Sequence, residues 1–211
     1  IGENWYIGET LHSGIGQGYF QSTPMQLCRM TAQIANGGYE LKPRIIFNKE
    51  NNSIKSFLDF KSKNPKTPVP QNLLPINSNI KPLFKNSEHI NFIKDAMFAS
   101  SNEPGGTSYR SRLEDDRYTF AGKTGSSQIK KFTEEQREAE VKQDEIEYKS
   151  RDHALFVAFA PYKDPKYAIS VVVEHGGSGS SSAAPIAKKI IKKVLERHEL
   201  RKKISAEEEI S

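Results

Sequence analysis

The chain has 211 residues, of which 36% are hydrophobic and 27% are charged, and it carries a formal net charge of +5. This length suits one domain, or the larger part of one, with room for a sizeable core. The lysines are interleaved with glutamates, and no zinc-finger spacing, RNP-like aromatic pattern or arginine-rich arm occurs, so the basic charge does not indicate a nucleic-acid partner.

The single cysteine, Cys28, excludes an internal disulfide framework, and we expect it to be a buried structural thiol. The five histidines show no metal-ligand spacing, so no metal site is predicted. No run of about 18 apolar residues occurs, and no segment of the sequence is therefore expected to span a membrane.

The first predicted helix follows residues 1–22, which are rich in glycine and aromatic side chains. Thr23 is a candidate N-cap, Pro24 suits the first helical position, and Gln26 completes a capping box. Residues 36–38 (Asn-Gly-Gly) end the helix. Within it, Leu27, Met30, Thr31 and Ile34 form a stripe at helical spacing.

The middle of the chain alternates polar loops with short predicted elements. A short strand is expected at 39–47, and surface loops at 49–87 with one strand at 54–60. A second helix is predicted at 89–101, and the Pro-Gly-Gly of 104–106 ends it.

Three strands are predicted in the C-terminal half, at 118–129, 154–160 and 167–174. The last two are joined by a turn at 163–165 and should form a hairpin. Between the first two strands lies a run of mixed charges, 130–152, which we interpret as a solvated insertion.

The last predicted helix begins between Ser182 and Pro185. Its apolar residues recur in pairs four residues apart, at Ile186/Ala187, Ile190/Ile191 and Val194/Leu195. One domain is expected over 1–200, followed by a frayed tail at 201–211. Helices first, then consecutive strands, then a closing helix indicate an α+β fold in which helices cover an antiparallel sheet.

Residues 120–128 (Phe-Ala-Gly-Lys-Thr-Gly-Ser-Ser-Gln) are the segment most informative about chemistry. A phosphate-binding loop would need a glycine at Arg117 and a helix directly after the Gly-Lys-Thr, and neither condition is met. The alternative is the Lys-Thr-Gly signature of penicillin-recognising serine enzymes.

A β-strand suits the chemistry of the Lys-Thr-Gly signature. Thr124 and Ser126 share one face of a strand, where two hydroxyls can hold a substrate carboxylate, and Lys123 points the other way but adds positive charge. Gly125 lets substrate and neighbouring backbone approach closely. The backbone N–H of Ser126 is a candidate oxyanion donor. The predicted site residues are thus Lys123 and Ser126 for catalysis, and Thr124, Gly125 and Ser126 for substrate binding.

The surrounding motifs closely resemble the class B penicillin-binding proteins, and are most like penicillin-binding protein 2, the elongation type. The matching segments follow the family's order, at 5–10, 14–19, 23–27, 35–38, 105–107, 121–128, 153–161, 174–177 and 183–187. The likeness runs from the first residues to about Leu195, with gaps at 48–87 and 130–152.

The resemblance implies the penicillin-binding/serine β-lactamase-like transpeptidase fold, present in part. It also implies a D,D-transpeptidase at the periplasmic face of the bacterial inner membrane, with its anchor upstream of this chain and a membrane glycosyltransferase of the elongation machinery as partner. In that family a serine of Ser-x-x-Lys attacks the D-Ala-D-Ala of a peptidoglycan stem peptide, and the acyl group passes to an amine. Penicillins acylate the same serine, and no metal or organic cofactor is needed.

The nucleophile of the family is expected to lie before Ile1, together with the Ser-x-Asn motif. Formal matches at 78–81, 127–130 and 100–102 fall in a proline-rich loop, in the Lys-Thr-Gly strand itself and at a helix end, and we expect none of them to be catalytic. Without an activated serine, this chain alone should not form an acyl-enzyme.

Two further functions remain open at this point. A non-catalytic sensor that binds wall peptide or β-lactam could use the same fold, and a serine β-lactamase shares Lys-Thr-Gly. The Gly-Gln-Gly-Tyr of 16–19 and the Thr-Pro-x-Gln of 23–26 argue against the β-lactamase. The small-residue run 176–182 is expected as a flexible turn beside the cleft, and His153 and His175 as hydrogen-bonded structural residues.

Overall fold

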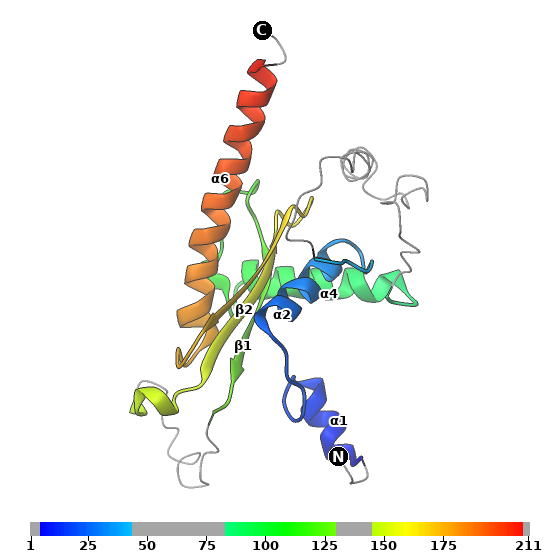
Figure 1. The fold of residues 1–211 in the computed structure, drawn as a ribbon, viewed down its shortest axis with the longest axis vertical. Coiled ribbons are helices and arrows are strands. Elements are labelled where there is room, and N and C mark those ends of the chain that lie inside the picture. The colour runs from blue at the N-terminus through cyan, green and yellow to red at the C-terminus, as the bar shows by residue number, and fades with distance from the viewer. Residues whose placement is uncertain (1–4, 44–82, 130–144, 209–211) are drawn as a thin grey trace.

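The computed structural model describes residues 5–43, 83–129 and 145–208, with side chains as far as Arg201. In this part of the chain a three-stranded antiparallel sheet lies between one long helix and two shorter ones (Figure 1). The predicted class, an α+β fold with helices covering an antiparallel sheet, is confirmed.

The sheet has the order β1-β2-β3, built from β1 (Ala121–Ser127), β2 (His153–Ala160) and β3 (Tyr167–Val173). β2 and β3 form the predicted hairpin, with Ala160 opposite Tyr167. The strand predicted before the charged insertion is also confirmed, although β1 is shorter at both ends. One edge of β1 pairs with β2, and no strand in the described part of the chain pairs with its other edge.

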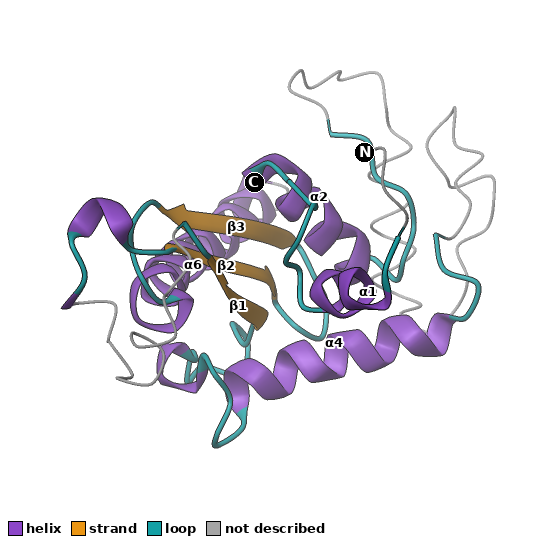
Figure 2. Cartoon of the chain, turned by 90° about the horizontal axis from the view of Figure 1, so that it is seen from below, coloured by secondary structure: helices purple, strands orange, loops and turns teal. Residues whose placement is uncertain are grey.

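Helix α6 (Ala184–Glu208) covers one face of the sheet, and α2 (Pro24–Ala35) and α4 (Ser87–Asn102) lie on the other side (Figure 2). The start of α2 is as predicted. The Oγ1 of Thr23 accepts a hydrogen bond from the N–H of Gln26 at 3.2 Å, and the Thr23 N–H donates to Oε1 of Gln26 at 2.7 Å. This reciprocal pair satisfies two of the N–H groups that a helix start leaves free.

Four short helical segments complete the described chain. They are α1 (Ile7–Gly14), η2 (Tyr109–Ser111), η4 (Tyr148–Ser150) and η5 (Gly179–Ala183). The sequence pattern predicts no helix at α1, which is a difference from the structure. The flexible turn expected near η5 is instead a wide helical turn that leads directly into α6.

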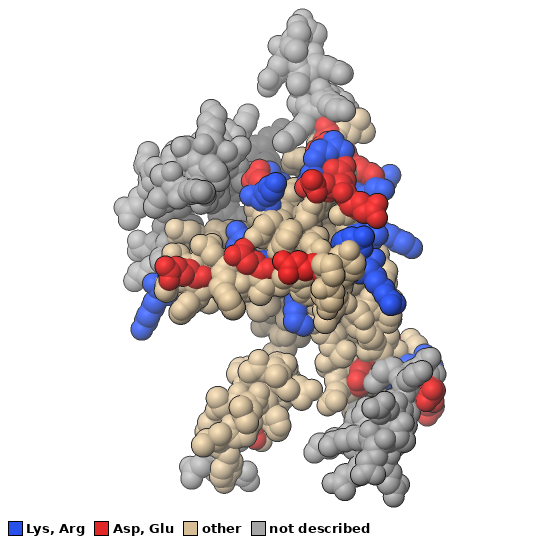
Figure 3. Space-filling model, turned by 180° about the vertical axis from the view of Figure 1, so that it is seen from behind, with Lys and Arg blue, Asp and Glu red and all other residues tan. Residues whose placement is uncertain are grey.

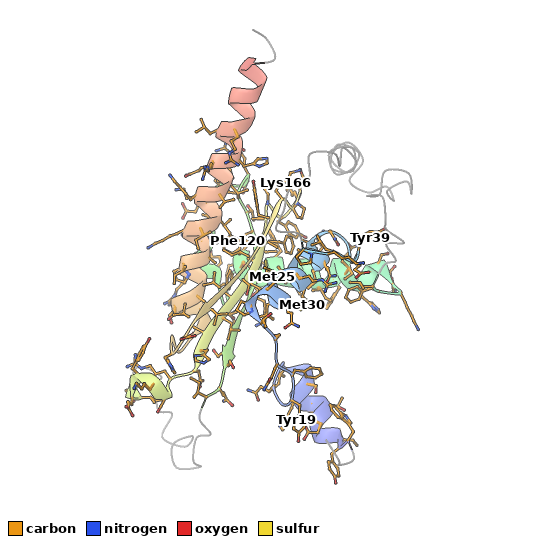
Figure 4. All side chains as sticks on the ribbon, viewed as in Figure 1. Tyr19, Met25, Met30, Tyr39, Phe120 and Lys166 are labelled. Carbon is orange, nitrogen blue, oxygen red and sulfur yellow. The ribbon has the colours of Figure 1, made fainter. Side chains whose placement is uncertain are left out.

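The core between the sheet and α6 is built around two aromatic rings. Phe120, labelled in Figure 4, and Phe156 are fully buried in the cluster that includes residues of α6, and their rings meet edge to face with centroids 6.0 Å apart. Burying a side chain of this size stabilises a fold by about 1.5–3 kcal/mol. One member of each predicted apolar pair of α6 joins this cluster: Ala187, Ile191 and Leu195. Ile186 and Ile190 remain largely exposed.

A second core cluster fills the space between the sheet and the two shorter helices. It consists of Ile34, Ala35, Met97, Ala121 and Phe159. Of the stripe at helical spacing on α2, Thr31 and Ile34 are buried, whereas Met30 is 44% exposed. Met30 lies on α2 with Met25, which is also exposed (Figure 4).

Tyr162, just after β2, ties the sheet to α4. Its ring lies 4.5 Å from that of Phe98 and 6.3 Å from that of Phe159. Its hydroxyl donates a hydrogen bond to Oδ1 of Asp95. Burial first, and then the bond to Asp95, raises the pKa of Tyr162 to about 12, so the hydroxyl keeps its proton at neutral pH.

Several predictions from the sequence fall wholly or partly outside the described residues. Of the strand expected at 39–47, the structure shows a single bridge at Tyr39 and no strand at 40–43, and the rest is not described. The strand at 54–60 and most of the insertion 130–152 are not described either. The limits of the domain and its frayed tail stay predictions. None of the helices in the described ranges combines the length and the hydropathy that crossing a bilayer requires.

The packing of β1 against Phe156 gives a first testable prediction. A Cβ at Gly122 would lie 2.4 Å from Cζ of Phe156 and 3.0 Å from the Val157 carbonyl oxygen. Because Phe156 is fully buried and cannot move away, Gly122→Ala should lower the free energy of unfolding by about 1–3 kcal/mol, measured by chemical denaturation.

Gly125→Ala is the matched control on the same strand. A Cβ there would make only an ordinary contact, 3.5 Å from Cβ of Leu155. The free energy of unfolding should change by less than about 1 kcal/mol in this variant. Equal losses in the two variants would contradict the packing described for β1.

Candidate functional site

The strand that carries Lys-Thr-Gly forms one wall of a hollow of about 380 Å³, which we call the β1 hollow. Its lining comes from four parts of the chain: Ile15, Thr107, the β1 residues 123–126, and the turn residues 178–180. The structure therefore brings together all the site residues predicted from the sequence. Their catalytic and binding roles stay predictions.

Alternation along β1 assigns its side chains to two faces. Phe120 belongs to the core cluster on the α6 side, and Ala121 belongs to the cluster on the side of α2 and α4. Thr124 and Ser126 therefore share the face of Phe120, while Lys123 has the face of Ala121. The two hydroxyls thus lie on one face, as the spacing requires.

Among the residues that the structure describes, Lys123 is the only charged one that lines the β1 hollow. It is exposed, and its Nζ donates a hydrogen bond to the carbonyl oxygen of Thr124 at 2.7 Å. Although the side chain leaves the opposite face of the strand, its length lets it reach the rim of the hollow. Five hydroxyl groups share the lining with this single positive charge, those of Thr107, Thr124, Ser126, Ser178 and Ser180.

Thr107 is a lining residue that reasoning from the sequence missed. It follows α4 in the Gly105-Gly106 turn, and its Oγ1 accepts a hydrogen bond from the Thr124 hydroxyl at 3.0 Å. The Oγ of Ser100, in the last turn of α4, lies 3.1 Å from the same atom. The signal in the sequence is the Gly-Gly-Thr motif at 105–107, which forms part of the family resemblance.

The turn after β3 forms the other wall of the hollow. The hydroxyl of Ser126 donates to the carbonyl oxygen of Gly177 at 3.4 Å. Gly179 is buried, and a Cβ on it would lie 2.4 Å from the Leu155 carbonyl oxygen and 2.6 Å from that of Gly125. A neighbouring backbone does approach β1 closely, but the glycine that permits this is Gly179, because a Cβ on Gly125 would make only an ordinary contact with Cβ of Leu155 at 3.5 Å.

Two histidines stabilise the start of this turn through hydrogen bonds. The N–H of His175 donates to Nδ1 of His153 at 3.0 Å, and the two rings lie 4.9 Å apart, edge to face. His175 has a φ of 54°, a left-handed conformation that few residues other than glycine adopt. The N–H of Gly177 also donates to the Asp152 carbonyl oxygen at 2.8 Å. The predicted hydrogen-bonded role of both histidines is confirmed.

The described residues of the formal Ser-x-x-Lys and Ser-x-Asn matches make structural contacts. Ser101 is fully buried, with its Oγ 3.0 Å from the Oγ of Ser108. Asn102 donates to the carbonyl oxygens of Phe98 and Phe120 and so fastens the end of α4 to the chain entering β1. The motif at 78–81 and Lys130 lie outside the described residues.

The lining of the β1 hollow offers donors that suit an anion, but its described residues present no activated nucleophile. The hydroxyls of Ser178 and Ser180 lie 2.8 Å apart and contact each other, and Lys123 donates to a backbone carbonyl. Across the described ranges no cluster of three metal-ligating side chains is found. The thiol of Cys28 is half-buried, and burial raises its pKa, so it is not a reactive thiolate.

A larger hollow of about 470 Å³ lies at the opposite end of β1, beside Tyr162 and Thr119. Charges of both signs line it: Arg112, Glu114, Asp116 and Lys163. Because it contains none of the predicted site residues, we place the candidate site at the β1 hollow.

Comparison with known proteins gives consistent matches. The family model for the penicillin binding protein transpeptidase domain matches residues 1–192. Peptidoglycan D,D-transpeptidase MrdA of Salmonella typhimurium (strain SL1344) is 34% identical over 188 residues, which are 89% of this chain and 27% of that protein. MrdA of Haemophilus influenzae is 30% identical over 187 residues, 89% of this chain and 26% of that protein. The chain thus spans about a quarter of the length of these curated relatives.

Solved structures with a similar fold are penicillin-binding proteins. The PBP2 of Helicobacter pylori, in a complex with MreC, has a TM-score of 0.65 and 28% identity, covering 92% of this chain and 28% of that one. The PBP2 of Pseudomonas aeruginosa, in a complex with WCK 5153, has a TM-score of 0.59 and 30% identity, covering 90% of this chain and 33% of that one.

The contact between Gly179 and β1 gives a second testable prediction. In Gly179→Ala the new Cβ must push the turn away from two backbone oxygens, because it would lie within 2.6 Å of both. We expect the free energy of unfolding to fall by about 1–3 kcal/mol. Hydrogen exchange should become faster at the amides of 124–127, because the hollow loses one of its walls.

Gly8→Ala is the control, since a Cβ at this position in α1 would contact nothing within 4 Å. Hydrogen exchange at 124–127 should be unchanged in this variant. Normal exchange in Gly179→Ala as well would mean that the turn does not hold β1.

Proposed function

Because the chain belongs to the penicillin-binding protein transpeptidase family, we propose that it is the Lys-Thr-Gly-bearing part of a PBP2-type peptidoglycan D,D-transpeptidase. In this proposal it supplies the substrate-carboxylate site, and a nucleophilic serine outside this chain supplies the covalent chemistry. The chain alone is then inactive.

The observation that carries the proposal is the composition of the β1 hollow. Within the described part of the chain, one positive charge and five hydroxyls line it, and no acidic side chain does. Hydroxyl and ammonium groups are donors to a carboxylate, and hydrogen bonds with a charged partner are about twice as strong as neutral ones. The terminal carboxylate of a D-Ala-D-Ala stem peptide, or the carboxylate of a penicillin, fits this lining.

Each predicted residue then has a defined part in the reaction. Thr124 and Ser126 hold the donor carboxylate through their hydroxyls, and Lys123 adds attraction for the anion. The serine attacks the carbonyl carbon between the two D-alanines, and negative charge develops on the carbonyl oxygen. The backbone N–H of Ser126 stabilises that charge, an arrangement whose loss typically costs about 3 kcal/mol. The terminal D-alanine leaves, and an amine of a second stem peptide takes the acyl group.

We also propose where the reaction takes place and which partners the enzyme has. Stem peptides and penicillins meet this enzyme at the periplasmic face of the inner membrane, where an upstream anchor holds it. A membrane glycosyltransferase of the elongation machinery supplies the glycan strands. Supporting this assignment, the curated relatives are named peptidoglycan D,D-transpeptidases and a PBP2 is among the similar structures.

An apolar surface beside the hollow is where the nucleophile-bearing part would bind. Figure 1 shows α1 set apart from the sheet, and no residue of α1 is buried. This α1 apolar surface consists of Trp5, Tyr6, Ile7, Leu11, Ile15, Tyr19 and Phe20, each at least 60% exposed. Between residues 5 and 28 the only charged residue is Glu9, and Figure 3 shows few charged side chains on this part of the molecule.

Such a surface is costly to leave in water, and apolar patches of this kind mark interaction sites. Ile15 belongs both to this surface and to the lining of the β1 hollow. A polypeptide that covers the α1 apolar surface would therefore stand directly beside Thr124. We assign this surface to the part of the transpeptidase domain that carries the nucleophilic serine.

Covalent labelling by fluorescent penicillin tests the proposed site. In the domain completed with its nucleophile-bearing part, Thr124→Val and Lys123→Ala should each lower the rate of labelling roughly 10- to 100-fold, because each loses a bond to the carboxylate. Lys163→Ala is the matched control, since this lysine lies at the other hollow. Unchanged labelling in both site variants would refute the assignment, and labelling of the 211-residue chain alone would refute its inactivity.

Trp5 offers a direct test of the α1 apolar surface, because it is the only tryptophan of the chain and is 61% exposed. When the nucleophile-bearing part binds, the emission assigned to Trp5 by difference from Trp5→Phe should shift to shorter wavelength. Leu11→Asp should prevent the shift, and His12→Gln, also exposed on α1, should not. A shift that appears with protein concentration alone would indicate a second copy of the chain as occupant and contradict this assignment.

A further inference from the structure

Three hydroxyl groups from three elements form a chain along one wall of the β1 hollow. Ser100 lies in the last turn of α4, Thr107 in the turn that follows, and Thr124 in β1. The Oγ atoms of Ser100 and Thr107 are 3.1 Å apart, and the Thr124 hydroxyl donates to Thr107 at 3.0 Å. We refer to these three residues as the hydroxyl chain.

The hydroxyl chain has one proton that it can donate to an acceptor outside the chain. Each hydroxyl has one proton and two acceptor sites, and two links among three groups use two of the three protons. One proton is left for a partner outside the chain. Thr124 already gives its proton to Thr107, so when Ser100 also donates to Thr107, the spare proton belongs to Thr107. Thr107 lines the β1 hollow and Ser100 does not.

The position of Thr107 is set by tight backbone packing. A Cβ at Gly106 would lie 2.4 Å from the carbonyl oxygen of Ser100 and 2.7 Å from that of Ala99, so only glycine lets the turn lie this close to the end of α4. The N–H of Ser108 also donates to the Ser100 oxygen, at 3.0 Å. The Thr107 hydroxyl is therefore held at one place beside β1, although its side chain is exposed.

We propose that Thr107 is a carboxylate-binding residue of the β1 hollow, oriented by Ser100, and that it selects a free carboxylate over an amide. The inference rests on the proposed function and adds a residue and a specificity to it. A carboxylate accepts the spare proton of the hydroxyl chain directly. If it draws the Thr124 proton instead, Thr107 turns to donate to Thr124 and Ser100 donates to Thr107, with no movement of the backbone.

The test compares two ligands that differ at one group. The 211-residue chain is titrated with N-acetyl-D-alanyl-D-alanine and with its C-terminal amide, and binding is followed by the NMR shifts of amides 123–126. The native chain should prefer the acid about tenfold, as expected for hydrogen bonds with a charged partner. Thr107→Val should lose most of that preference, Thr107→Ser should retain it, and Ser100→Ala should lower it by a smaller factor.

The outcomes separate the inference from the function on which it rests. If the native chain does not prefer the acid, the proposed function of the hollow fails. If the native chain prefers the acid and Thr107→Val does so equally, the inference about Thr107 is wrong while the function stands. Thr119→Val is the matched control, because that threonine donates to the Asp116 carbonyl oxygen outside the hollow, and it should keep the full preference. A loss in this control equal to that in Thr107→Val would show a general effect of the substitution and overturn the inference.

Discussion

The candidate site depends on the close approach of two backbone segments, at Gly179 and Gly125. A Cβ at 179 would fall within 2.6 Å of the carbonyl oxygens of Gly125 and Leu155, so the turn can rest on the sheet only with glycine there. Because it rests there, the carbonyl that accepts the Ser126 hydroxyl is in place. The hydrogen bond between the His175 N–H and His153 holds the same turn at its start. The hollow is thus shaped by contacts between backbone segments.

Two parts of the described chain differ in how much of their apolar surface is buried. Phe120 and Phe156 are fully buried between the sheet and α6, so this core is complete within the chain. At α1 the comparable side chains face water, with Ile7 84% exposed and Leu11 68% exposed. The β1 hollow is lined by β1 and by the turns at 107 and 178–180, whereas the α1 apolar surface is the part that, in the proposed function, the nucleophile-bearing part covers. This separation agrees with a chain that spans about a quarter of its relatives.

Much of the fold follows from local sequence signals. The features that the sequence did not predict depend mostly on contacts between distant segments. Thr23 and Gln26 define the start of α2, because a capping box is made by neighbouring residues. α1 could not be predicted, since Gly8 and Gly14 weaken its helical propensity and no core contact stabilises it. Thr107 and Gly179 were missed because their roles exist only where a turn meets β1 across the fold. The hydroxyl spacing on β1 itself was readable, since alternation is a property of any strand.

In the proposed function, a bound carboxylate replaces hydrogen bonds that Lys123 and Thr124 now make to neutral acceptors. Lys123 donates to the carbonyl oxygen of Thr124, a neutral acceptor on its own strand. A carboxylate would be a charged acceptor, and bonds of that kind are about twice as strong. The Thr124 hydroxyl likewise donates to a neutral oxygen, that of Thr107. Each exchange requires only rotation of a side chain, because β1 is held by β2 and by the turn at Gly179. If the hollow binds a carboxylate as proposed, its donors are already close to their binding positions, and little of the binding energy is lost in ordering the protein.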